Sequence, residues 1–325
     1  MIVVTGGAGF IGSALIWALN SRGREDVLVV DRLGTDDRWR NLRALSYADF
    51  MDKDDFIDLV RCRRLPGGIE TILHMGACSD TAENDADFLM RNNFAYSKNL
   101  IEYAVEQGIR LVYASSAATY GDGEQGYADD ENQLPRLRPL NMYGYSKHIT
   151  DLWAWRQGAL AAVAGVKFSN VFGPNEYHKG EMRSLVHKAF GQMKESGRVR
   201  LFKSYRPEYA DGEQVRDFIY VKDAVAMTLY LAEHGELNGL FNIGSGCARS
   251  WNDLVRSLSK AMEHGCQIEY VEMPEQLRAR YQYHTRLNID KIKRVGWRQV
   301  SRSLEEGVKD YVKKYMLEDK FLGEE

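Results

Sequence analysis

The chain has 325 residues, 44% of them hydrophobic, which is enough for one large α/β domain with a smaller lobe. Its formal net charge is −3 and it has no polybasic block, so we expect neither nucleic acid nor a membrane surface as a partner. The four cysteines lack metal-type spacing, the first predicted strand starts at residue 1, and no apolar run approaches about 18 residues. These features predict a metal-free cytoplasmic protein with reduced thiols.

The first 21 residues predict a strand, a glycine turn and a helix. A β-branched run at residues 2–5 is typical of a buried parallel strand, and apolar residues at helical spacing occupy residues 10–21. Between them lies Gly7-x-Gly9-x-x-Gly12. Glycines let the backbone bend sharply and approach a pyrophosphate, which would bind the free amides at the helix start. The pattern predicts a site for a nicotinamide dinucleotide.

A second apolar run, residues 27–30, ends in Asp31, where the acid that binds the ribose hydroxyls is expected. Arg32 and Arg38 follow it closely. Guanidinium groups there would hold a 2′-phosphate, which favours NADP over NAD, although both arginines could also be solvated loop residues. A third, poorly marked strand near residue 49 is followed by Lys53, where adenine is usually contacted.

Three further strands complete the expected sheet. Residues 69–74 lead into the small-residue turn at 75–79, residues 109–114 lead to Ser115 and Ser116, and residues 163–168 precede a segment that leaves the sheet at 170–174. A long helix is predicted over 89–105. Because ligands bind beyond the carboxyl ends of parallel strands, these turns should line the cofactor. The sequence predicts a Rossmann fold, a doubly wound parallel α/β sheet.

Residues 1–170 are expected to form the dinucleotide-binding domain, with return segments near 214–245. Residues 171–325 should form mainly a smaller α/β substrate lobe. Within it we predict strands at 218–224 and 239–244 around a helix. Helices at 251–262 and 303–316 should flank a cationic segment at 278–286.

Tyr143 and Lys147 are four residues apart, which places them on one face of a helix. A tyrosine base near neutral pH needs its pKa lowered by roughly 3 units from about 10, and nearby cations such as Lys147 and an oxidised nicotinamide could supply this. Ser116, at the end of the preceding strand, would hydrogen-bond the reacting oxygen. This set predicts hydride transfer assisted by an acid/base tyrosine.

Together, these motifs resemble the extended short-chain dehydrogenase/reductases, specifically the NAD-dependent epimerase/dehydratase family. The resemblance rests on residues 5–12, on Asp31, on the run at 113–121 and on Tyr143-Gly-Tyr-Ser-Lys147. It spans nearly the whole chain, and it implies bound nicotinamide cofactor and a nucleotide-sugar substrate.

A narrower set of motifs is similar to the ADP-L-glycero-D-manno-heptose 6-epimerases of this family: residues 74–79, Asn92-Asn93, residues 170–174, His178-Lys179-Gly180, residues 216–218 and Arg280-Tyr281. The resemblance implies a cytoplasmic, homo-oligomeric (in that group, pentameric) enzyme. It would use tightly held NADP to epimerise ADP-heptose at C6, through a 6-keto intermediate, for the lipopolysaccharide inner core.

By this resemblance the catalytic residues are Tyr143, Lys179, Ser116 and Lys147. The expected cofactor-binding residues are Gly6, Gly9, Phe10, Ile11, Gly12, Asp31, Arg32, Arg38, Lys53, Met75, Gly76, Ala77, Cys78, Ser79, Asn92, Lys147 and Val171. The expected substrate-binding residues are Ser116, Asn170, Glu181, Lys188, Phe202, Arg216, Arg280 and Tyr281.

Three other functions were weighed. A nucleotide-sugar 4,6-dehydratase needs an acid and a base after the strand-end serine, where this chain has Ala117 and Ala118. A nucleotide-sugar 4-epimerase shares the glycine turn and the Tyr/Lys pair, and only the region of His178-Lys179-Gly180 separates it. A cofactor-sensing regulator would need a damaged Tyr/Lys/Ser set, and the set is intact. Ser169 and Glu181 depart from the usual motifs and bear on the choice of sugar.

Overall fold

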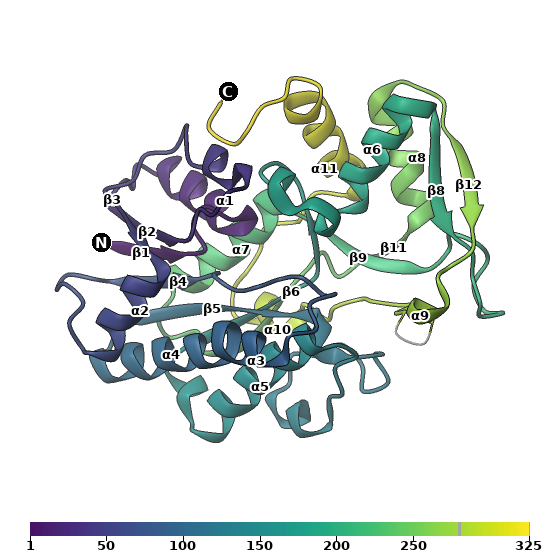
Figure 1. Cartoon of the computed structure of the whole chain (residues 1–325). Coiled ribbons are helices and arrows are strands. Elements are labelled where there is room, and N and C mark those ends of the chain that lie inside the picture. The colour runs from purple at the N-terminus through teal and green to yellow at the C-terminus, as the bar shows by residue number, and fades with distance from the viewer. Residues whose placement is uncertain (279–280, 325) are drawn as a thin grey trace.

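The computed structural model describes residues 1–278 and 281–324, and its centre is a seven-stranded sheet in the order β10-β6-β5-β4-β1-β2-β3 (Figure 1). Every pair of neighbouring strands in this sheet runs parallel. The strands are β1 (Ile2–Thr5), β2 (Val27–Asp31), β3 (Asp49–Asp52), β4 (Thr71–His74), β5 (Arg110–Ser116), β6 (Ala164–Phe168) and β10 (Gly239–Ile243). The predicted Rossmann fold is confirmed.

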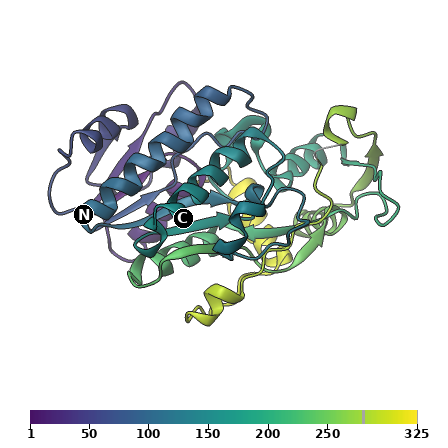
Figure 2. The ribbon, with the colours of Figure 1, turned by 90° about the horizontal axis from the view of Figure 1, so that it is seen from below.

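Helices cover both faces of this sheet (Figure 2). On one face α1 (Phe10–Asn20) packs against α7 (Val221–Glu233). On the other face α4 (Tyr96–Gln107) lies between α2 (Lys53–Arg61) and α5 (Met142–Arg156). The helix predicted over 89–105 is present as α3 (Ala86–Leu89), a π-helical turn at Met90–Ala95 and α4, in direct succession.

The inner strands are buried on both sides, which explains their apolar sequences. All four residues of β1 and all five of β2 are buried, and Val3 and Val4 pair in register with Leu28 and Val29. A strand covered by helices on both faces has no side chains in solvent, so its sequence is a nearly continuous run of apolar, mostly β-branched residues.

A second group of elements lies at the opposite end of the molecule from β3 (Figure 1). Its three-stranded sheet contains β7 (Asn170–Phe172), β9 (Val215–Tyr220) and β11 (Ala248–Ser250), and its two-stranded sheet contains β8 (Arg198–Phe202) and β12 (Gln267–Val271). The helices here are α6 (Leu185–Ser196), α8 (Trp251–Met262), α9 (Glu275–Arg278) and α11 (Leu304–Tyr311), which is followed by a π turn at Val312–Met316. Helix α10 (Asp290–Arg294) instead packs beside β10 of the main sheet.

Single turns of 3₁₀ helix occupy Asp37–Asn41, Ala117–Tyr120, Glu131–Arg136, Ala159–Ala161 and Tyr177–Met182. The prediction of a strand over 218–224 was wrong in its second half, because α7 begins at Val221. Val221, Ala224, Val225 and Thr228 are all buried, a helical spacing that the short apolar run at 218–221 obscured. The strand predicted at 239–244 is confirmed as β10, and it returns to the main sheet.

Candidate functional site

A cavity of about 910 Å³ lies beyond the carboxyl ends of β1, β2, β4 and β5. Loops from the second group of elements close its other side, through residues 169–172, 178–186 and the start of α8. Of the residues predicted for the site, it is lined by Gly6, Gly9, Phe10, Ile11, Gly12, Asp31, Arg32, Arg38, Lys53, Met75, Gly76, Ala77, Cys78, Ser79, Asn92, Ser116, Tyr143, Lys147, Asn170, Val171, Lys179 and Glu181.

The glycine turn forms one wall of the cavity. Gly6 has φ of +67°, and a Cβ on Gly12 would come within 2.0 Å of the Gly6 carbonyl oxygen, so both positions require glycine. Helix α1 begins directly after Gly9, and no side chain caps it. Its first backbone amides are therefore open to an anion at the positive end of the helix, which fits the diphosphate of a dinucleotide.

Asp31 lies at the end of β2 with a largely buried carboxylate. It accepts hydrogen bonds from the backbone amides of Ala8 (2.9 Å) and Arg32 (2.7 Å), and burial raises its pKa. An amino group of Arg38 lies 3.7 Å from Asp31, while the same guanidinium makes a two-point contact with Asp36. The Arg38 cation thus lies beside Asp31, the predicted ribose-binding acid, and is held there by the carboxylate of Asp36.

Lys53 and Asn92 form a hydrogen-bonded pair in the wall of the same cavity. The Lys53 ammonium donates to Asn92 Oδ1 at 3.1 Å and lies 6.0 Å from the ring centre of Tyr96. The pair joins the start of α2 to the π-helical turn before α4, and both residues line the cavity.

Tyr143, Lys147 and Ser116 converge at the end of β5. The Ser116 hydroxyl is hydrogen-bonded to Tyr143, and the Lys147 ammonium donates to the carbonyl oxygen of Ala114 at 2.9 Å. Burial lowers the pKa of Lys147 to about 8. It raises the pKa of Tyr143, with the Ser116 bond opposing that rise. The protein alone thus acts opposite to the expected direction, because burial outweighs the Ser116 bond. The Lys147 ammonium bonds the strand end and not the tyrosine.

Lys179 lies on the 3₁₀ turn after β7, and its ammonium is 5.6 Å from the ring centre of Phe10, the first residue of α1. Desolvation lowers the pKa of Lys179, and the nearby Glu176 carboxylate opposes that shift. The lysine therefore shares a cavity with Tyr143 although 36 positions separate them in the chain (179 − 143).

Arg216, Tyr281 and Phe202 form a neighbouring cluster instead of lining the cavity. The Arg216 guanidinium lies 5.3 Å from the ring centre of Trp251 and 5.2 Å from that of Tyr281, whose ring is 6.3 Å from Phe202. Arg216 is buried, which lowers its pKa, and its guanidinium donates a hydrogen bond to the carbonyl oxygen of Val215 at 2.9 Å. Trp251 lines the cavity and so connects this cluster to it.

Two predicted substrate residues remain apart from these groups. Lys188 on α6 lies outside the cavity lining and pairs with Glu181 at 3.3 Å, and Arg280 lies outside the described residues. The sequence reasoning missed Trp251, treating it as the first residue of an amphipathic helix. Its position directly after the capping residue Ser250, at a strand end, was the available signal.

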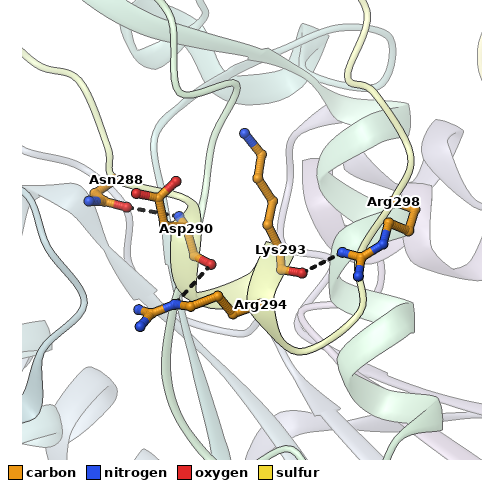
Figure 3. Close-up of a pocket in the computed structure, with 5 residues that line it drawn as sticks. All are labelled: Asn288, Asp290, Lys293, Arg294 and Arg298. Carbon is orange, nitrogen blue, oxygen red and sulfur yellow. Dashed lines mark hydrogen bonds between the residues drawn. The ribbon is translucent and has the colours of Figure 1, made fainter.

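A second pocket, of about 630 Å³, lies at the surface around α10 (Figure 3). Its basic side chains do not converge: Arg294 Nε contacts the Asp290 carbonyl oxygen, Arg298 donates to the Lys293 carbonyl oxygen, and Lys293 points away from both. Across residues 1–278 and 281–324 there is no metal-binding group of His, Cys, Asp or Glu side chains. Within those same ranges, no helix has the length and apolar content required to cross a membrane.

The model of the NAD dependent epimerase/dehydratase family matches residues 2–244. Two relatives named ADP-L-glycero-D-manno-heptose-6-epimerase cover nearly the whole chain. That of Nitratidesulfovibrio vulgaris strain DP4 is 52% identical over 97% of this chain and 98% of its own. That of Fusobacterium nucleatum subsp. nucleatum is 48% identical over 99% of this chain and 100% of its own.

Solved structures of two kinds of epimerase are also similar. The Helicobacter pylori ADP-L-glycero-D-manno-heptose-6-epimerase has a TM-score of 0.80 at 28% identity, covering 96% of this chain and 94% of its own. The UDP-glucose 4-epimerase of Thermotoga maritima has a TM-score of 0.79 at 26% identity, covering 98% and 99%. The fold alone does not separate the two activities. The glycine turn, the pair of Tyr143 and Lys147 and the match to the family model all indicate the same family. This chain belongs to the NAD dependent epimerase/dehydratase family.

Proposed function

We propose that this protein is an isomerase that converts ADP-D-glycero-D-manno-heptose to ADP-L-glycero-D-manno-heptose by inversion at C6. The product would supply the lipopolysaccharide inner core. One observation carries the proposal: Tyr143 and Lys179 line the same cavity as the glycine turn. An inversion benefits from a proton-transfer group for each configuration of the reacting carbon. The identity of 48–52% to relatives named for this reaction favours it over 4-epimerisation.

NADP is the proposed cofactor, and when bound it accepts hydride from C6 and returns it to the resulting ketone. Arg38, and at longer reach Arg32, would bind the 2′-phosphate, while the amides at the start of α1 would bind the diphosphate. Lys53 and Asn92 would bind the adenine end of the cofactor.

Tyr143 is proposed to remove and return the proton of the C6 hydroxyl in one epimer. Its hydroxyl is already bonded to Ser116, which would also bond the reacting oxygen. Lys147 holds the end of β5 through Ala114 and would lie beside the ribose of the cofactor. Because burial raises the pKa of Tyr143, the tyrosine stays protonated until a positive charge enters the site.

Lys179 is proposed to do the same for the other epimer. A lysine must be neutral to accept a proton, and the desolvation that lowers its pKa favours that state. The keto intermediate would turn between the two groups, held through its diphosphate by Arg216 and Tyr281, with Asn170 and Glu181 contacting the sugar. Homo-oligomerisation, as a pentamer, remains a prediction from resemblance.

The test is to incubate the purified protein with ADP-D-glycero-D-manno-heptose, without added cofactor, and to follow both epimers by NMR. Tyr143→Phe and Lys179→Met should each lower the rate by about 10²- to 10⁴-fold, the usual contribution of a positioned acid or base. A heptose analogue with an aldehyde at the reacting carbon would separate the two half-reactions.

Two matched variants control for side-chain loss. Tyr145→Phe removes an exposed hydroxyl from the same helix, and Lys194→Met removes an exposed lysine from α6; both should keep the wild-type rate. Near-normal epimerisation by Lys179→Met would mean that one tyrosine serves both configurations. Conversion of UDP-glucose in place of the heptose substrate would establish the 4-epimerase function instead.

A further inference from the structure

The loop from Gly173 to Ser184, between β7 and α6, carries Lys179 near its middle and is closed from inside by one carboxylate. Glu176 is 1% exposed. Its Oε1 accepts hydrogen bonds from the Gly173 amide (3.3 Å) and the Ser184 hydroxyl (2.7 Å), and its Oε2 accepts one from the Ser184 amide. The carboxylate thus bonds the first and the last residue of the loop.

This bonding also fixes the start of α6. Ser184 is the N-cap of that helix, and its hydroxyl accepts from the His187 amide at 3.3 Å. The Glu176 carboxylate therefore sits at the N-terminal end of a 12-residue helix, where a negative charge is stabilised. The Lys179 amide in turn donates to the Glu176 carbonyl oxygen at 3.1 Å.

The outer side of the loop is fastened as well. Asn175 has φ of +75°, and its side chain donates to Ser13 Oγ on α1 and accepts from the Leu322 amide, both at 3.0 Å. Because the backbone is fixed both before and after Lys179, the turn presents the Lys179 side chain to the cavity from a defined position. The hydrogen bonds of Glu176 fix the loop from its inner side, and those of Asn175 fix it from its outer side.

Glu176 also acts on Lys179 by charge. Burial raises the pKa of Glu176 and lowers that of Lys179, and the attraction between the two opposes both shifts. The other titratable groups facing the carboxylate are the hydroxyls of Tyr177 and Tyr311, whose pKa values are raised by burial and by Glu176 itself. The neighbouring His178 is kept neutral by burial, its pKa lowered to about 4.

We propose that Glu176 is the positioning residue of Lys179, because its carboxylate joins the two ends of the loop that carries the lysine and its carbonyl oxygen accepts the Lys179 amide. The consequence for turnover rests on the proposed acid/base role of Lys179. Removing the charge should make Lys179 easier to deprotonate, and removing the bonds should let the loop move.

The charge is tested on the full-length protein by ¹³C NMR of reductively dimethylated lysines, with the Lys179 signal assigned by its loss in Lys179→Met. Glu176→Gln should shift the Lys179 titration downward by about 1 unit, as expected for loss of a nearby opposite charge. Glu181→Gln removes the same charge from a 94% exposed side chain, where solvent screens it, and should leave that titration in place. An unmoved Lys179 titration in Glu176→Gln overturns the charge role.

The loop-closing role is tested with Glu176→Asp, which keeps the charge but shortens its reach by one methylene. Its Lys179 titration should stay close to wild type, while the epimerisation rate falls at least about tenfold. A wild-type rate in Glu176→Asp overturns that role, even if Glu176→Gln fails to fold. The NMR result does not depend on turnover, so an active Lys179→Met would refute the proposed function while leaving the link between Glu176 and Lys179 measurable.

Discussion

The side-chain amide of Asn41 donates a hydrogen bond to the carbonyl oxygen of Ala8, 2.9 Å away, inside the glycine turn. The same Nδ2 lies 3.1 Å from the carbonyl oxygen of Asn175 and 3.2 Å from His178 Nδ1. The amide of Ala8 is itself bonded to Asp31. One buried side chain therefore connects the turn and the ribose acid to the loop that carries Lys179.

Replacement of Asn41 by alanine should cost stability and cofactor affinity together. The carbonyl groups of Ala8 and Asn175 would be left buried without this donor, and each such loss costs about 1–3 kcal/mol. Urea unfolding measures the stability and calorimetric titration measures the affinity for NADP. Asn99→Ala, which removes an amide bonded one turn back to the Ala95 carbonyl oxygen at the end of the preceding π turn, should change both values far less. Equal effects of the two variants would show that Asn41 has no special linking role.

Arg38→Ala should weaken binding of NADP by about 10- to 100-fold while changing NAD binding much less, because only NADP has a 2′-phosphate to pair with the guanidinium. Titration of the cofactor-free protein with each nucleotide measures both constants. Arg40→Ala, in the same 3₁₀ turn but outside the cavity lining, is the matched control. Release of NAD alone from the denatured wild-type protein would contradict the NADP assignment.

Arg216→Ala should raise KM for the nucleotide sugar about 10- to 100-fold with a smaller effect on kcat, since a desolvated guanidinium suits a diphosphate. Arg216→Lys should recover little, because an ammonium cannot make the planar two-point contact or stack between Trp251 and Tyr281. The cross-strand partner Arg249 is paired with Asp253 and Glu305. Arg249→Ala should therefore leave KM close to wild type. An unchanged KM in Arg216→Ala would mean that Arg216 has a structural role and does not bind the substrate.

Stability should fall as the pH drops below about 6.5, in part through His74. Its ring nitrogens lie 2.6 Å from Thr5 Oγ1 and 2.8 Å from Ser97 Oγ, and burial lowers its pKa to about 3. In the unfolded chain the His74 ring therefore binds a proton as the pH falls through about 6.5, whereas in the folded protein it binds that proton only near pH 3. At pH 5 this difference amounts to about 2 kcal/mol of lost stability.

Unfolding free energies measured between pH 7.5 and 5 in His74→Gln should have a shallower pH slope than wild type. His264→Gln, at an exposed histidine, should keep the wild-type slope. An identical slope in all three proteins would mean that His74 is protonated within the fold.

The residues whose positions could be predicted from the sequence are those fixed by short-range patterns. Tyr143 and Lys147 share a helix face, and Ser116 ends a strand whose neighbours in a parallel sheet must bring their carboxyl ends to the same edge. Six of the seven sheet strands followed from apolar runs, because strands buried on both faces have no polar side, whereas β3 is not buried and was poorly marked. Strand order then placed the turns around one cavity.

The remainder depended on contacts distant in the chain. Asn41 lies in a polar segment that looks solvated, and it becomes buried only because the loop at Asn175 packs over it. Arg216 was predicted as a ligand of the substrate, and its stacking between Trp251 and Tyr281 joins strand β9, the start of helix α8 and a late segment that no local pattern connects. Lys188 does not line the cavity itself but pairs with Glu181, which does, a contact across the loop that local sequence does not reveal.

Strand β10 has a consequence for biosynthesis. It pairs along the whole length of β6, whose five residues are all buried, although β10 follows in the chain only after β7, β8 and β9. Until residue 243 has left the ribosome, the backbone donors and acceptors along this apolar edge stay unpaired, a form prone to strand-to-strand aggregation. A chain shortened after residue 170 should therefore precipitate on expression, and a nascent chain that pauses before β10 should depend on chaperones that shield an open sheet edge.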